Sequence, residues 1–128
     1  MNDRMPCAMI IDDDPNVRKI LERLFSCYEW NSLAFIGPET ALAAFRPGKF
    51  DLLLCDMDLG ENRDGLTVAL EISARDPFLR VALMSGDWRN EDRARSRSLR
   101  FIGKPFDVMT IYRLCDWAKK KSEKAHEL

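Results

Sequence analysis

Short apolar runs alternate along the chain with segments of helical periodicity. Five runs predict strands, at residues 7–11, 31–36, 50–55, 79–84 and 100–103. The third, FDLLLC, is the most strongly apolar and is typical of a parallel strand that is covered on both faces. Strands that alternate with helices in this way favour a parallel sheet between two layers of helices.

Helix signals lie between these runs. Pro15 suits the first position of a helix, with Asp14 as its cap, and Pro105 is expected to open the last helix. Asp64 and Gly65 mark the start of another helix. The positions of the last helix expected to face inward are Val108, Ile111, Tyr112 and Cys115. The fold class expected is α/β, a doubly wound five-stranded parallel sheet in the flavodoxin-like order 2-1-3-4-5.

Composition narrows the classes of partner. The 128 residues suit one domain, and 20 basic against 21 acidic residues give a net charge of −1. This balance predicts no general attraction to nucleic acid or to a membrane surface. No apolar run approaches the roughly 20 residues that span a bilayer. The 4 cysteines are scattered and there is 1 histidine, which disfavours zinc and indicates reduced thiols in a cytoplasmic protein.

Polar residues follow four of the predicted strands. Asp12 and Asp13 follow the first, Asp56 the third, Ser85 the fourth and Lys104 the fifth. The carboxyl ends of parallel strands meet at one edge, where open α/β sheets bind their ligands. In the order 2-1-3-4-5 the first and third strands are neighbours, so the three aspartates are expected to converge.

Such a cluster has a chemical consequence. Three carboxylates repel one another unless one is protonated or a cation joins them, and oxygen ligands suit Mg²⁺. Lys104 adds a positive charge and Ser85 a hydroxyl donor. A carboxylate in these surroundings is placed to attack a phosphoryl group. Helix capping or a simple turn explains any one of these strand ends, but explains all four together less well.

Four stretches carry a family resemblance: IIDDDPNVRKIL, LLLCDMDLGENRDGL, VALMSG and FIGKPF. Together they resemble the receiver domain of bacterial two-component response regulators. The resemblance covers residues 7 to about 118, with the motifs in the family's order. No output domain follows in this sequence, so residues 1–128 resemble a single-domain, chemotaxis-regulator-like receiver or an excised one.

The resemblance implies roles for the acidic residues. Asp56 matches the phospho-accepting aspartate. Asp12 and Asp13 match the acidic pair that binds Mg²⁺, with Asp13 favoured as the direct ligand. The backbone carbonyl of Asp58 is implied as a further ligand.

The remaining implied roles concern the phosphoryl group and the partners. Lys104 matches the lysine that contacts the phosphoryl group, and Ser85 and Phe101 match the residues that switch position on activation. The implied phosphoryl donor is a sensor histidine kinase. The implied recipient of the signal is a downstream protein target or, in a phosphorelay, a histidine phosphotransfer protein.

The sequence also departs from the family's pattern. The proline after the phospho-accepting aspartate is absent, with Gly60 near its place, and the loop from Asp56 to Asp64 is one residue longer. The stretch between Ser85 and Lys104 is about three residues shorter.

The fourth helix falls in this shortened stretch. We expect it to be short or irregular, with Trp88 and Leu99 as its only anchors. The arginines of 88–100 are interleaved with acids, which favours a solvated face over nucleic-acid binding.

The stretch LLLCDMDL also has features of two other kinds of site. It resembles the nucleophile motif of haloacid-dehalogenase-type phosphatases, with Asp56 as nucleophile and Asp58 as acid/base. Against this, Gly60 stands where that family has threonine or valine, and there is no room for a cap domain. A calcium loop fails because Thr67 stands where a bidentate glutamate is needed. The side chains of Asp58 and Asp87 are also expected to flank the phosphoryl group.

Overall fold

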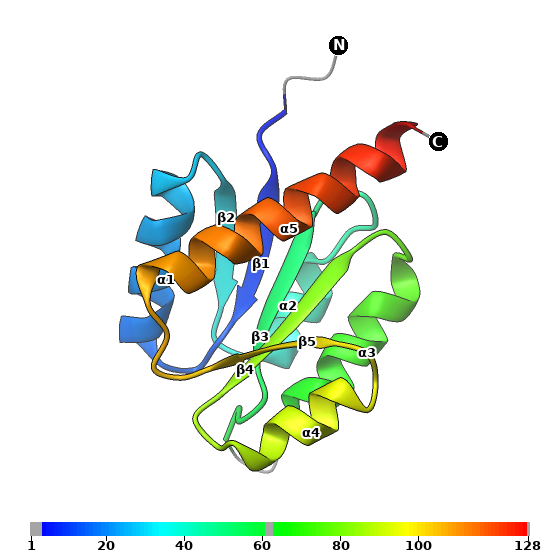
Figure 1. Cartoon of the computed structure of the whole chain (residues 1–128). Coiled ribbons are helices and arrows are strands. Elements are labelled where there is room, and N and C mark those ends of the chain that lie inside the picture. The colour runs from blue at the N-terminus through cyan, green and yellow to red at the C-terminus, as the bar shows by residue number, and fades with distance from the viewer. Residues whose placement is uncertain (1–3, 61–62, 128) are drawn as a thin grey trace.

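The computed structural model describes residues 4–60 and 63–127, and side chains as far as residue 120. Its strands form a single parallel sheet in the order β2-β1-β3-β4-β5 (Figure 1). The strands are β1 (Cys7–Ile11), β2 (Asn31–Phe35), β3 (Leu52–Asp56), β4 (Arg80–Ser85) and β5 (Arg100–Gly103). The fold class and strand order predicted from the sequence are confirmed, and the strand boundaries agree to within two residues.

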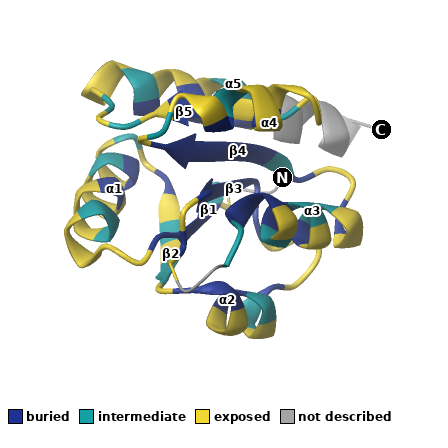
Figure 2. Cartoon of the chain, turned by 90° about the horizontal axis from the view of Figure 1, so that it is seen from below, coloured by how far each residue is buried: buried dark blue, intermediate teal, exposed yellow. Residues whose placement is uncertain are grey.

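Helices cover both faces of the sheet. They are α1 (Pro15–Cys27), α2 (Pro38–Ala44), α3 (Gly65–Arg75), α4 (Arg89–Arg95) and α5 (Val108–Glu127). One core cluster joins the sheet to α2, α3 and α4, and the other joins it to α1 and α5. Strands β1, β3 and β4 are almost entirely buried, the edge strands β2 and β5 are more exposed, and the helices expose their outer sides (Figure 2). Every residue of β3 is buried, as its apolar sequence predicts.

The register of the sheet aligns the ends of the strands that carry polar residues. Ile11 of β1 pairs with Cys55 of β3, so the residues that follow them, Asp12 and Asp56, are neighbours. Ser85 at the end of β4 pairs with Gly103 of β5. These carboxyl ends lie on the side of the sheet away from the two chain termini (Figure 1).

The two predicted proline starts had different outcomes. Pro15 is the first residue of α1, and the Asp14 carboxylate accepts from the amide of Asn16 at 2.9 Å, as predicted. Pro105, which follows a cis peptide bond, does not open α5. That helix begins at Val108 because the Asp107 carboxylate caps it instead.

The inward face of α5 was predicted only in part. Ile111 and Cys115 are buried as expected, but Val108 and Tyr112 are 54% and 48% exposed. The buried stripe runs through Ile111, Leu114, Cys115 and Ala118, so Val108 and Tyr112 lie to one side of it.

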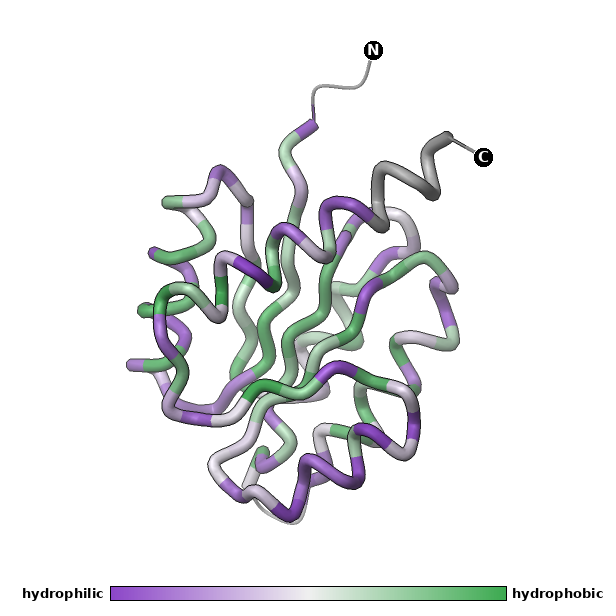
Figure 3. The backbone as a smooth tube through the Cα atoms, in the orientation of Figure 1, coloured by the Kyte–Doolittle hydropathy of each residue, from purple (hydrophilic) through white to green (hydrophobic). Residues whose placement is uncertain are grey.

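Helix α4 is short, as predicted, with seven residues. Its anchors differ from the prediction, because Trp88 is 76% exposed and packs outside the core. Trp88 precedes the first turn, whereas Ala94 lies on the inner side of the helix and is fully buried. Leu99 packs against the core as expected. Most of the helix is hydrophilic (Figure 3), so little apolar area holds it.

Two further predictions from the sequence concern the loop after β3 and the absence of a membrane-spanning segment. The predicted extra residue in the loop from Asp56 to Asp64 falls partly on residues 61 and 62, which are outside the described residues. Among the described helices, none combines the length and hydropathy that a bilayer crossing requires.

Candidate functional site

Three carboxylates converge at the carboxyl ends of β1 and β3. Asp12, Asp13 and Asp56 each place an oxygen within 4.8 Å of the others, which confirms the convergence expected from strand order. Asp12 and Asp56 are buried, while Asp13 is exposed. A set of carboxylate oxygens this close suits a small hard cation, and Mg²⁺ fits it.

Lys104 bridges the two buried members of this cluster. Its Nζ lies 2.8 Å from Oδ2 of Asp12 and 3.1 Å from Oδ2 of Asp56. The amide of Lys104 donates to the carbonyl of Ser85 at 2.9 Å, which fixes the end of β5 beside β4. The ammonium group is therefore held over the corner where the acids meet.

The buried charges shift one another's protonation. Burial raises the pKa of Asp56, and the nearby Asp12 adds to this, although the amide of Asp58 and the Lys104 ammonium act in the opposite direction. Burial works to lower the pKa of Lys104, but its hydrogen bond to Asp12 and the charge of Asp56 outweigh it and leave the pKa raised. Lys104 is thus a fixed cation at neutral pH, facing a carboxylate that gains from added positive charge.

Backbone amides orient the two buried carboxylates. Oδ1 of Asp12 accepts from the amide of Asp14, and Oδ1 of Asp56 accepts from the amide of Asp58, each at 2.9 Å. The second oxygen of each carboxylate is the one that meets Lys104. Each side chain is therefore fixed by its own loop on one side and by the lysine on the other.

Gly65 lies directly against the backbone of Asp56. A Cβ at this position would overlap the carbonyl oxygen of Asp56 and lie 2.7 Å from its carbonyl carbon. The first residue of α3 therefore has to be glycine for the helix to approach the end of β3 this closely.

The Ser85 hydroxyl contacts two side chains, those of Asp58 and Asn90. Its Oγ donates to Oδ2 of Asp58 at 2.7 Å and accepts from Nδ2 of Asn90 at 3.0 Å. Asn90 was not predicted, although its spacing of four from Ala94 places both on the inner side of α4 and could have indicated it. The Asp58 side chain thus lies beside Ser85.

The remaining predicted residues take different positions. The Asp87 carboxylate pairs with Arg89 at 2.9 Å, and hydrogen bonds from Arg89 lower its pKa. Only the amide of Asp87 reaches Ser85 Oγ, at 3.0 Å. Phe101 is partly buried against the core. The switching role of Phe101 and the ligand role of the Asp58 carbonyl stay predictions.

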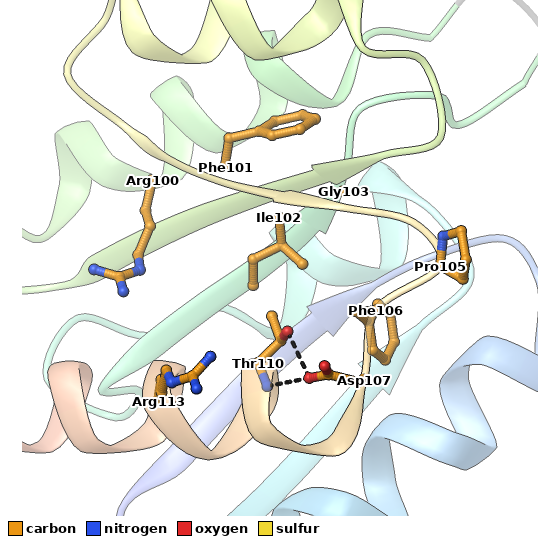
Figure 4. A pocket seen from close by; sticks show the side chains of 9 residues that line it. All are labelled: Arg100, Phe101, Ile102, Gly103, Pro105, Phe106, Asp107, Thr110 and Arg113. Atoms are coloured by element: carbon orange, nitrogen blue, oxygen red, sulfur yellow. Dashed lines mark hydrogen bonds between the residues drawn. The ribbon is translucent and has the colours of Figure 1, made fainter.

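A cleft of about 520 Å³ lies over β5 and the start of α5 (Figure 4). It is lined by Arg100, Phe101, Ile102, Gly103, Pro105, Phe106, Asp107, Thr110 and Arg113. None of the three clustered aspartates lines it, so the cleft is separate from the acidic corner.

Comparison with known proteins assigns the chain to a class. Residues 8–115 match the family model of the response regulator receiver domain. The chain therefore belongs to this family, the receivers of two-component response regulators.

Particular relatives and structures are consistent with this assignment. The transcriptional regulatory protein ZraR of Salmonella typhimurium is 32% identical over 103 residues, covering 77% of this chain and 23% of ZraR. The DNA-binding transcriptional regulator NtrC of Klebsiella pneumoniae is 30% identical over 115 residues, covering 87% of this chain and 24% of NtrC. The chain thus spans about a quarter of the length of these relatives.

Solved structures share the fold. A receiver domain protein from Clostridium thermocellum superposes with a TM-score of 0.85 at 17% identity, over 94% of this chain and 99% of that one. TrrA from Thermotoga maritima, in complex with Mg²⁺ and BeF, has a TM-score of 0.79 at 22% identity, over 89% of this chain and 99% of TrrA. At sequence identities of 17% and 22%, the structural similarity shows a shared fold and no more than that.

Proposed function

We propose that the chain accepts a phosphoryl group on Asp56 from the phosphohistidine of a sensor histidine kinase. The observation that carries this is the position of the buried Asp56 carboxylate, which meets Asp12, Asp13 and the Lys104 ammonium at one sheet edge. A carboxylate oxygen of Asp56 attacks phosphorus, the N–P bond of the phosphohistidine breaks, and an acyl phosphate forms. Mg²⁺ held by the three aspartates, with the Asp58 carbonyl as a further ligand, would neutralise charge on the phosphoryl oxygens.

The other site residues act on the product. Lys104 keeps a positive charge beside the phosphoryl oxygens, and the Ser85 hydroxyl turns toward them, with Phe101 following. The changed surface signals to a downstream protein target or, in a phosphorelay, to a histidine phosphotransfer protein, until water hydrolyses the acyl phosphate. NtrC is described as DNA-binding, but the chain matches 24% of it, so nucleic acid is not part of the proposal.

A phosphatase of the haloacid-dehalogenase type is the competing proposal, and the geometry favours it less. Asp58 would then have to hand a proton to the leaving group. Its carboxylate instead accepts from Ser85 at 2.7 Å and from Asn90 at 3.3 Å. We therefore expect a phospho-acceptor and no sustained turnover of p-nitrophenyl phosphate.

Labelling by a small phosphodonor tests the proposed function. With Mg²⁺ and acetyl phosphate, intact mass spectrometry should show one added phosphoryl group on the wild type and none on Asp56→Asn. The matched control is Asp51→Asn. Asp51 is also a buried aspartate, but it directly precedes β3 and so lies at the opposite end of that strand from Asp56. Equal labelling of wild type and Asp56→Asn would refute Asp56 as the acceptor.

Removing Asp13 should separate metal binding from folding. Asp13 is exposed and lies in the three-carboxylate cluster, so Asp13→Ala removes a ligand and relieves repulsion at once. We expect Mg²⁺ affinity to fall by about tenfold or more, while thermal stability without metal stays equal or rises. Asp87→Ala, which removes a charge outside the cluster, should leave the Mg²⁺ titration unchanged. An unaltered titration of Asp13→Ala would show that Asp13 is not a ligand.

A further inference from the structure

A second hydrogen-bonded cluster lies beside the acids. Asp58 and Asn90 both contact the Oγ of Ser85, and Nδ2 of Asn90 also lies 3.3 Å from Oδ1 of Asp58. Ser85 and Asn90 are 2% and 7% exposed, so their polar atoms depend on partners within the protein. The three side chains therefore form one closed set of contacts.

Arg93 extends this set along α4 and across to α3. Its Nη1 donates to Oδ1 of Asn90 at 3.0 Å, and its Nη2 donates to Oδ2 of Asp64 at 2.8 Å. Asp64 immediately precedes α3 and also accepts from Oγ1 of Thr67 at 3.0 Å. We call Asp58, Ser85, Asn90 and Arg93 the latch, because they connect the loop after β3 to α4 and to the start of α3.

The proton of the Ser85 hydroxyl is committed to Asp58 in this arrangement. An ionised carboxylate can only accept, so at 2.7 Å Ser85 is the donor. The side-chain amide of Asn90 and the backbone amide of Asp87 both donate to the same Oγ, so its lone pairs are occupied while its single proton is held by Asp58. A phosphoryl oxygen on Asp56 could gain the Ser85 hydrogen bond only after Asp58 gives it up.

We propose that Asp58 is a positioning residue that holds the Ser85 hydroxyl in the resting protein, and that a phosphoryl group on Asp56 opens the latch and loosens α4. This inference rests on the proposed function of Asp56. It assigns the Asp58 side chain to the control of Ser85, separately from the ligand role predicted for its carbonyl.

Electrostatic repulsion favours transfer of the Ser85 hydrogen bond from Asp58 to the phosphoryl group. A phosphoryl group brings about −1.5 to −2 charges at neutral pH. The amide of Asp58 donates to Oδ1 of Asp56 at 2.9 Å, so the Asp58 residue lies next to the acceptor carboxylate. Like charges at this range disfavour each other, and Asp58 is exposed enough to turn its carboxylate into water.

Opening the latch should reach α4 because little else holds that helix. Its seven residues bury one apolar side chain fully, that of Ala94. Isolated helices of this length are marginal in water, so contacts from Asn90 and Arg93 carry a large part of its attachment. Loss of the Asp58 end of the latch therefore frees the first turn of α4, beside the exposed Trp88.

Beryllofluoride binding with Mg²⁺ tests the competition. Asp58→Ala leaves the hydroxyl of Ser85 free, so beryllofluoride should bind about tenfold more tightly than to the wild type. Asp116→Ala is the matched control, because it removes an equal charge from α5, where the Asp116 carboxylate pairs with Lys120. Its affinity should stay within about twofold. Equal gains in both variants, or weaker binding by Asp58→Ala, would overturn the proposal.

Hydrogen exchange tests the latch without any phosphoryl group. In Mg²⁺ alone, the amides of residues 89–95 should exchange at least about threefold faster in Asp58→Ala and in Arg93→Gln than in the wild type, while Asp116→Ala, which removes a charge from α5, should match the wild type. Unchanged exchange in both latch variants would overturn the latch. If the wild type neither takes label on Asp56 nor binds beryllofluoride, the proposed function fails while this exchange result still decides the latch.

Discussion

Gly65→Ala is expected to destabilise the protein by about 3 kcal/mol or more, as a case of severe overpacking. The new Cβ would overlap the carbonyl oxygen of Asp56 and lie 2.7 Å from the Cα of Met57. Both neighbours are backbone atoms, so no side-chain rotation can relieve the overlap. The start of α3 or the end of β3 has to move, and either movement displaces the Asp56 carboxylate.

Chemical denaturation measures the loss, and Gly86→Ala is the control. Gly86 follows β4 at the same sheet edge, but a Cβ there meets no heavy atom within 4 Å. That variant should stay within about 1 kcal/mol of the wild type. Where Gly65→Ala remains folded, its labelling by acetyl phosphate should be slower, because Asp56 has shifted. Wild-type stability and labelling in Gly65→Ala would show that the helix start adapts without cost.

The sheet and its acidic corner could be predicted from the sequence because local patterns decide them. Apolar runs of four to six residues defined the strands, and in a parallel sheet the residues after them share an edge. Strand order then brought Asp12, Asp13 and Asp56 together. No long-range side-chain contact had to be guessed at any of these steps.

The latch could not be predicted in the same way. Asp58 and Asn90 are 32 residues apart in sequence, and Asn90 lies in a polar stretch that was expected to be solvated. Their meeting depends on how α4 packs over the loop after β3. The outward position of Trp88 was missed for a related reason: hydrophobicity suggested an anchor, whereas the helix begins one residue later and turns Asn90 and Ala94 inward.

The start of α5 shows competition between two local signals. Pro105 suits a first helical position, but Asp107 accepts hydrogen bonds from both the amide and the hydroxyl of Thr110, at 2.8 and 2.9 Å. The side-chain cap supplies an acceptor to an amide that the helix leaves unpaired, which proline cannot do. The sequence signal that indicates this helix start is an aspartate three residues before a threonine, here Asp107 and Thr110.

Lys104→Met should give the other large effect. We expect it to lower the free energy of unfolding by about 3 kcal/mol at neutral pH, because it leaves two buried carboxylates without their cation. The Lys104 ammonium contacts Asp12 at 2.8 Å and Asp56 at 3.1 Å, and its own side chain is 22% exposed. Methionine preserves the length and apolar stem of the side chain, so the lost charge dominates. The control is Lys120→Met, which breaks an exposed pair with Asp116 and should change stability by less than about 0.5 kcal/mol.

The pH dependence of the unfolding free energy of Lys104→Met shows whether the lost charge causes the destabilisation. Burial already raises the pKa of Asp56 in the folded wild type, and removing the ammonium raises it further. An acid with a raised folded pKa destabilises the protein above that pKa, and this cost vanishes below its unfolded value of about 3.9. The gap in unfolding free energy between the variant and the wild type should therefore narrow as pH falls from 7 toward 4.

Mg²⁺ at neutral pH should narrow this gap in unfolding free energy too, because the metal replaces the missing positive charge at the three carboxylates. Denaturation curves at several pH values, with and without Mg²⁺, measure both effects. A gap that is constant with pH and unmoved by Mg²⁺ would assign the loss to packing instead.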